Sequence, residues 1–265
     1  MTAAELPDVL HRSVAIFIFA LGIGMVAVHT ALAALAAQQP TLGRRKPILL
    51  AGLVGAYLTL WFGLAVTVGD RTNFPLERED LRLWLSLLVG FGPMFLGIAV
   101  LFASKAMRHL NAAMPAHWLI WAQTYRMAGL MFLFPFLYYG ILPAAFAIPA
   151  GLGDFLTGAF APFVGLAVAR QRPQAITWAT AWNIFGVLDL IVAPAAAVLS
   201  HAQVIGLYPV SLVPLFIGPP LGILTHVYSL RNLAMLSSAA VVSPSDQSPK
   251  ADSRGMRTEG AVRPA

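Results

Sequence analysis

The chain consists mainly of long apolar runs separated by short polar segments. A helix needs about 20 apolar residues to cross the hydrocarbon layer of a membrane. Runs of that length predict spans near residues 14–37, 48–68, 83–103, 118–142, 145–169, 175–199 and 208–230. The runs lack the two-residue alternation of a transmembrane β-barrel. The pattern therefore predicts an all-α, polytopic membrane helix bundle with about seven transmembrane helices.

The least regular part of the pattern lies between the fourth and fifth runs. The sequence LPAAFAIPAG contains Pro143 and Pro149, so the chain can turn sharply there or re-enter the membrane. A six-span or eight-segment arrangement is the alternative. Residues 237–265 are rich in Ser, Pro, Gly and charge, which is typical of disorder. We therefore expect a transmembrane domain over 1–236 and a disordered cytoplasmic tail over 237–265.

The composition narrows the class further. Hydrophobic residues make up 58% of the chain and charged residues only 11%, against about 25% charged in soluble proteins. A water-soluble globule is excluded, and the lipid bilayer of the cell (inner or plasma) membrane is the expected environment. The absence of cysteine excludes disulfides and thiolate metal sites. The net charge of +6 comes from basic residues that flank the spans, so we expect no nucleic-acid partner.

The basic residues also predict the orientation, because cytoplasmic loops of membrane proteins are enriched in Lys and Arg. With seven spans, one side carries Arg44, Arg45, Lys46, Lys105, Arg108, Arg170, Arg172, Arg231, Lys250, Arg254, Arg257 and Arg263. The other side carries only Arg12, Arg71, Arg78 and Arg82. The amino terminus is therefore predicted outside and the carboxyl terminus in the cytoplasm.

A cleaved signal peptide is the competing interpretation of the first run. The sequence ALAALAAQQ resembles a small-residue cleavage site. However, Glu5 and Asp8 precede the run, and cleavage would leave the basic residues at positions 44–46 outside. We therefore expect the first run to remain as a span.

Two aspartates, Asp154 and Asp189, lie inside predicted spans. A carboxylate at the bilayer centre costs roughly 2.5–3.5 kcal/mol on insertion scales, so it is rarely kept without a use. Helical spacing places Asp154 on one face with Gly151, Gly158, Ala161 and Gly165. Such small residues allow close helix contact. Asp154 is thus predicted to face protein and not lipid.

The sixth and fourth spans carry similar faces. Asp189 shares one with Ala179, Trp182, Gly186 and Ala193, and Asn183 lies about 100° round the helix from Trp182. In the fourth span, Gln123 and Arg126 align with Leu119, Leu130 and Leu133. The polar side chains of three spans are therefore expected to meet inside the bundle.

A rise of about 1.5 Å per residue gives the depth of each polar group from the cytoplasmic helix end. Asp154 and Asp189 share a layer at about 21–22 Å, and Arg126 lies roughly 9 Å below it, together with Asn183 and His29. A pair between Arg126 and either aspartate is the leading contact prediction. If the carboxylates approach each other, one of them should hold a proton. The plainer interpretation is a structural ion pair that fixes helix register.

These residues define the candidate site and the candidate functions. The predicted substrate- or proton-binding residues are Asp154, Asp189, Arg126, Asn183, Gln123 and Trp182. They favour a transporter or permease for an unknown small solute. A membrane-embedded enzyme is the alternative, although no nucleophile and base pair stands at helical spacing.

Two further alternatives involve partners of the chain. One is a haem-binding electron-transfer subunit that uses His29 and His226, which we consider weak because two isolated histidines specify no metal; we expect no cofactor and no metal site. The other is a structural partner, either in a homo-oligomer or in a larger membrane complex. A retinal protein is excluded because Lys46, Lys105 and Lys250 all lie outside the spans.

Overall fold

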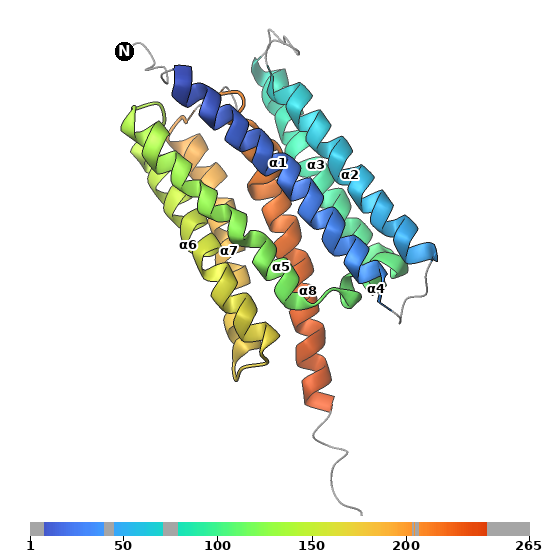
Figure 1. Ribbon diagram of the computed structural model, residues 1–265. Coiled ribbons are helices and arrows are strands. Elements are labelled where there is room, and N and C mark those ends of the chain that lie inside the picture. Colours follow the sequence, from blue (N-terminus) through green and yellow to red (C-terminus); the bar gives the residue numbers. More distant parts are fainter. Residues whose placement is uncertain (1–7, 40–44, 71–78, 203, 205–206, 243–265) are drawn as a thin grey trace, which may run out of the picture.

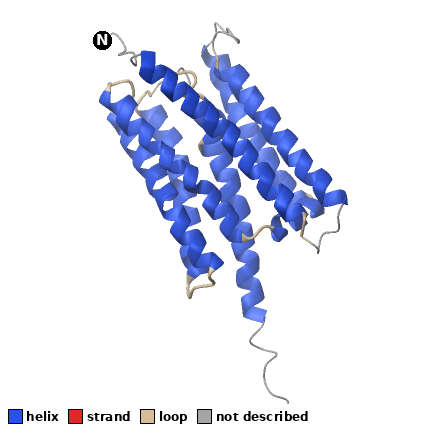
Figure 2. Ribbon diagram, in the orientation of Figure 1, coloured by secondary structure: helices blue, strands red, loops and turns tan. Residues whose placement is uncertain are grey.

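The computed structural model describes residues 8–39, 45–70, 79–202, 204 and 207–242, and these residues form helices joined by turns, with no strand (Figure 2). Among them, six helical segments are long and apolar enough to cross a membrane. Five are the helices α1 (Asp8–Ala37), α2 (Arg45–Gly69), α3 (Glu79–Ala103), α6 (Ala144–Ala169) and α7 (Ala175–Leu199). The sixth combines the π-helical segment η5 (Val213–Ile217) with α8 (Pro219–Val242). The predicted all-α class is confirmed, as a helical membrane bundle.

The fourth predicted span is not one uniform helix. It is divided into α5 (Ala116–Ala122), the 3₁₀ segment η2 (Gln123–Gly129) and the π-helical segment η3 (Phe132–Leu137). The π-helical segment contains Pro135, whose missing N–H interrupts regular α-helical hydrogen bonding. The predicted span near 118–142 is therefore helical over most of its length, but it is divided into segments of three helix types. Gly140, with a φ of +67°, then forms a turn, and α6 begins directly after Pro143.

Two other element boundaries differ from the sequence pattern. A short helix, α4 (Lys105–Ala113), follows α3, and its first turn is capped by Ser104, whose hydroxyl accepts the Met107 N–H at 3.3 Å. At the carboxyl end, α8 continues to Val242. Residues 237–242 are thus helical and do not belong to the predicted disordered tail. The rest of that predicted tail, 243–265, lies outside the described residues.

The helices form two groups with α8 between them (Figure 1). The first group contains α1, α2 and α3, and the second contains α5, α6 and α7. Helix α8 contacts both groups and is the most buried of the long helices. Its polar side chains Thr225, His226, Ser229 and Asn232 are all buried. Because unpaired polar groups are unfavourable in lipid, a helix with this composition is stable only at the centre of the bundle.

The glycine-rich face of α6 packs as its spacing predicts. Gly151, Gly158, Ala161 and Gly165 are buried, and this face lies against α5 and η2. Large apolar side chains on the opposite side, such as Phe163, are exposed in the isolated chain. This distribution is that of a membrane helix with one face toward lipid and one toward protein.

Candidate functional site

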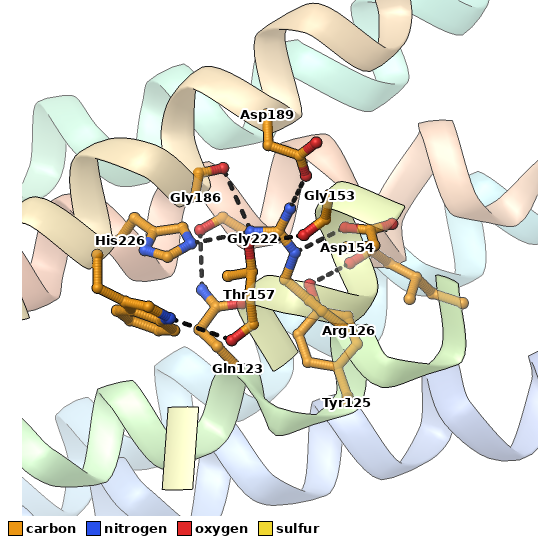
Figure 3. A network of polar contacts seen from close by, with 12 residues as sticks. Gln123, Tyr125, Arg126, Gly153, Asp154, Thr157, Gly186, Asp189, Gly222 and His226 are labelled. Atoms are coloured by element: carbon orange, nitrogen blue, oxygen red, sulfur yellow. Dashed lines mark hydrogen bonds and ion pairs between the residues drawn. The ribbon is translucent and has the colours of Figure 1, made fainter. Parts of the chain in front are cut away.

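Arg126 lies at the centre of a buried polar network (Figure 3). It projects from η2, and only 1% of its side chain is exposed. Its Nε donates to Asp154 Oδ1 on α6 at 2.7 Å, and its Nη2 donates to Asp189 Oδ2 on α7. Its Nη1 donates to the Gly186 carbonyl at 3.2 Å. The predicted contact is confirmed, and Arg126 binds both carboxylates directly.

His226 on α8 extends this network away from the carboxylates. Its Nε2 lies 3.2 Å from Arg126 Nη1 and its Nδ1 lies 2.8 Å from Asn183 Oδ1. A guanidinium only donates hydrogen bonds, so Nε2 must accept and the single ring proton lies on Nδ1. Nδ1 then donates to Asn183, whose Nδ2 donates to the Ala179 carbonyl at 2.7 Å. His226 is therefore a neutral imidazole in this arrangement.

Asp189 is held against the backbone of α6. A Cβ atom placed on Gly153 would lie only 1.7 Å from Asp189 Oδ1, so no other residue fits at position 153 without moving this carboxylate. The side chain of Asp189 is 10% exposed and that of Asp154 is 16% exposed. Both aspartates are inside the bundle, as predicted, and not on its lipid-facing surface.

The remaining predicted site residues support the network from the side of His226. The Trp182 ring packs on His226 with 5.2 Å between centroids, and Trp182 Nε1 donates to the Thr157 carbonyl at 3.1 Å. Gln123 Nε2 donates to the Gly222 carbonyl at 3.1 Å. Gln123, Asn183 and His226 are at most 1% exposed. His226 contacts Arg126 directly, and Gln123, Asn183, Trp182 and His226 do not line the cavity beside Asp154.

The two histidines considered as haem ligands have different hydrogen-bond partners. His29 on α1 donates from Nδ1 to the Met25 carbonyl at 2.9 Å, and its Nε2 lies 2.9 Å from Thr225 Oγ1. The contact with Thr225 links α1 to α8. Both ring nitrogens of His29 and both of His226 thus have hydrogen-bond partners. Either imidazole would have to give up a hydrogen bond to bind iron.

A cavity of about 410 Å³ adjoins the network at Asp154. Its walls come from α3, η3, α6, α7, η5 and the start of α8. Leu83 and Val198 line it and are 49% and 75% exposed, so they form its rim. Asp189 and Arg126 do not line this cavity. Asp154 is therefore the member of the charged network that a molecule in the cavity would meet.

The charges of the network do not balance. Arg126 contributes one positive charge, Asp154 and Asp189 contribute two negative charges when ionised, and His226 is neutral. An uncompensated charge is unfavourable inside a membrane protein. The cluster therefore suits the binding of one proton or one monovalent cation.

Sequence reasoning missed the role of His226 in this cluster. Its position four residues after Gly222 places the imidazole on the small-residue face of α8. This spacing, together with the expected depth of Asn183, could have indicated that His226 belongs to the cluster. The Gly186 carbonyl, which accepts from Arg126, carries no signal in the sequence because a backbone group is common to all residues.

These features define a class, namely a multi-pass helical membrane protein with a buried charged cluster beside a cavity. Residues 82–234, which make up more than half of the chain, match the family described as Domain of unknown function (DUF8737). The chain belongs to this family, and Arg126, Asp154, Asp189 and His226 all lie within the matched segment. No curated protein and no solved structure matches the chain.

Proposed function

We propose that this protein is a transporter for a small solute in the cell membrane, and that proton exchange at the Arg126–Asp154–Asp189 cluster drives it. The single observation that carries the proposal is that one buried guanidinium serves two carboxylates, one of which lines a cavity. Membrane-embedded carboxylates that gain and lose protons are typical of pumps and transporters.

A purely structural ion pair explains the cluster less well. One carboxylate is sufficient to neutralise Arg126 and to tie two elements together. The second carboxylate adds an excess negative charge, and this charge lowers stability unless a proton or cation accompanies it. An exchangeable proton gives the second carboxylate a use.

The cavity beside Asp154 gives access to the cluster, and this access supports the same proposal. Asp154 adjoins the cavity, whereas Gln123, Asn183 and His226 fill the opposite side and are buried. A transporter exposes its site to one side of the membrane at a time. The cavity at Asp154 suits the open side of one such state, with the buried Gln123, Asn183 and His226 opposite it.

The proposal includes seven crossings with the amino terminus outside. The divided segment formed by α5, η2 and η3 counts as the fourth crossing, since non-regular helix is tolerated where it is buried in protein. Its backbone lies against α6, and Arg126 and Gln123 point inward from it. The positive residues at 105–108, 170–172 and 231 then all fall on the cytoplasmic side. The cavity beside Asp154 would open in the outer half.

Rapid pH jumps on proteoliposomes adsorbed to a solid-supported membrane test this proposal without knowledge of the solute. Protonation of the cluster moves charge into the membrane, so the wild type should give a transient current. Asp154→Asn and Asp189→Asn each leave one carboxylate paired with Arg126, so both should lose the transient. Asp8→Asn, at an exposed position in the first turn of α1, is the matched control and should keep it. A wild type without a transient, or variants that retain it, would refute the proposal.

A further inference from the structure

The cavity beside Asp154 has an aromatic wall close to a carboxylate. Phe91, Phe132 and Phe146 come from α3, η3 and α6, and all three line it. The rings of Phe132 and Phe146 meet edge to face, with 5.5 Å between their centroids. Aromatic rings attract cations through the negative potential of their faces, and aromatic groups are the usual partners of quaternary ammonium ligands. This wall therefore favours an organic cation.

The charge of the adjoining cluster favours the same ligand. Asp154 is partly exposed on the cavity wall, and the cluster to which it belongs carries one more carboxylate than Arg126 neutralises. An anionic ligand would add to this excess. A cation beside Asp154 would compensate it, in the same way as a proton does.

The wall contributed by α3 adds a hydrogen-bonding group. Ser86 lines the cavity, is 3% exposed, and its hydroxyl has no hydrogen-bond partner in the structure. Buried hydroxyl groups are normally paired, and a small rotation of the Ser86 side chain would be needed to turn this one toward a ligand in the cavity. Arg82 also lines the cavity, one helical turn from Ser86, and already has an interaction of its own.

We infer that the cavity binds an organic ammonium ion with an apolar body, and that this ion takes the place of the proton on the carboxylate cluster. The inference rests on the proposed proton-binding function and names the substrate class of the same site. The exchange is balanced in charge, since one cation enters as one proton leaves. The O–H bond of the carboxyl group is the only covalent bond that breaks. The volume of about 410 Å³ lies within the range of small-molecule sites, which is about 300–1,000 Å³.

Other ionisable groups near Asp154 also bear on this exchange. These groups are Arg126 and Tyr125 from η2, Asp189 from α7, Arg82 from α3, which lines the same cavity, and His226 from α8, which contacts Arg126 on the side away from Asp154. His226 accepts from Arg126 and therefore stays neutral while that bond is kept. The phenol of Tyr125 donates to the Ile217 carbonyl at 2.7 Å. The proton that the ligand displaces is therefore assigned to the two carboxylates.

Benzyltrimethylammonium is a suitable probe, because neopentylbenzene is its neutral isostere. Titration into wild-type protein in weakly buffered nanodiscs, with a pH indicator dye, should show saturable binding and release of about one proton per site. Asp154→Asn should weaken binding at least about tenfold and abolish proton release, because it removes the charged partner. Phe146→Leu should weaken binding by about fivefold, which is a typical loss for one cation–π contact.

Phe163→Leu is the matched control for the aromatic wall. Phe163 lies on the same helix as Phe146, is 70% exposed, and does not line the cavity. This variant should bind the probe as the wild type does, and size-exclusion profiles should show that all variants are folded. The inference would be overturned if the probe did not bind saturably, or if it bound without releasing a proton. It would also be overturned if the neutral isostere competed equally well, or if both phenylalanine variants lost the same affinity for the probe. A pH-jump transient without probe binding would overturn the inference alone, and loss of both would overturn the proposed function as well.

Discussion

Arg126→Ala is expected to destabilise the protein by about 3–5 kcal/mol, because it leaves buried charges without a partner. Asp154 and Asp189 would then face each other across a vacated site, and the Gly186 carbonyl and His226 Nε2 would lose their donor. Thermal unfolding of the purified variant in nanodiscs should show a large fall in the midpoint. An unfolding midpoint equal to that of the wild type would contradict the account of the cluster.

A variant that lacks all three charges of the cluster separates their effect on stability from their effect on function. The triple substitution Arg126→Met, Asp154→Asn and Asp189→Asn removes all three charges and keeps similar side-chain volumes. Because a buried ion pair is often no more stabilising than apolar groups of the same size, most of the lost stability should return. The pH-jump transient should remain absent, since no carboxylate is left to accept a proton. A triple variant as unstable as Arg126→Ala would show that the charges are not the cause.

Gly158→Ala is expected to have the next largest effect, because Gly158 allows η2 to lie directly on α6. A Cβ atom at position 158 would lie 2.3 Å from the backbone nitrogen of Met127 and 2.9 Å from the carbonyl carbon of Arg126. These are backbone atoms, so the segment that carries Arg126 must move away. Overpacking of this kind costs about 1–3 kcal/mol, and it should also displace the guanidinium from the two carboxylates.

Gly63→Ala provides the control for this substitution. Gly63 lies within α2, and a Cβ atom there would have nothing within 4 Å. Alanine should be tolerated at position 63 and should favour the helix slightly. Gly158→Ala should lower the midpoint of thermal unfolding and reduce the pH-jump transient. Gly63→Ala should leave both unchanged. Equal behaviour of the two variants would mean that the close contact between η2 and α6 does not hold the cluster together.

The sequence predicted the helix positions well where the apolar runs were regular. The predicted spans 14–37, 48–68, 83–103, 145–169 and 175–199 each lie within one helix of the structure. Hydrophobic length is a sufficient guide there, because lipid imposes the same requirement along the whole run. The division of the fourth run into 3₁₀ and π-helical segments was not predicted, since apolar length does not tell the number of residues per helical turn.

The contacts of the candidate site were predictable in part. The faces of Arg126, Asp154 and Asp189 followed from helical spacing, and these residues meet in the structure. The central place of α8 did not follow from hydropathy, because hydropathy does not say which helices are neighbours. The polar residues of this helix, including His226, indicated it indirectly, since each of them needs a protein partner inside the membrane.

Infrared difference spectroscopy across a pH titration is the most direct test of the claim that the two carboxylates share one proton beside Arg126. Wild-type protein in nanodiscs should show the C=O stretching band of a buried, protonated carboxyl group, which disappears as this group ionises. The band should be absent in both Asp154→Asn and Asp189→Asn, since either change leaves a balanced ion pair, and present in Asp8→Asn. A wild type without such a band, or a band that survives both substitutions, would contradict the account.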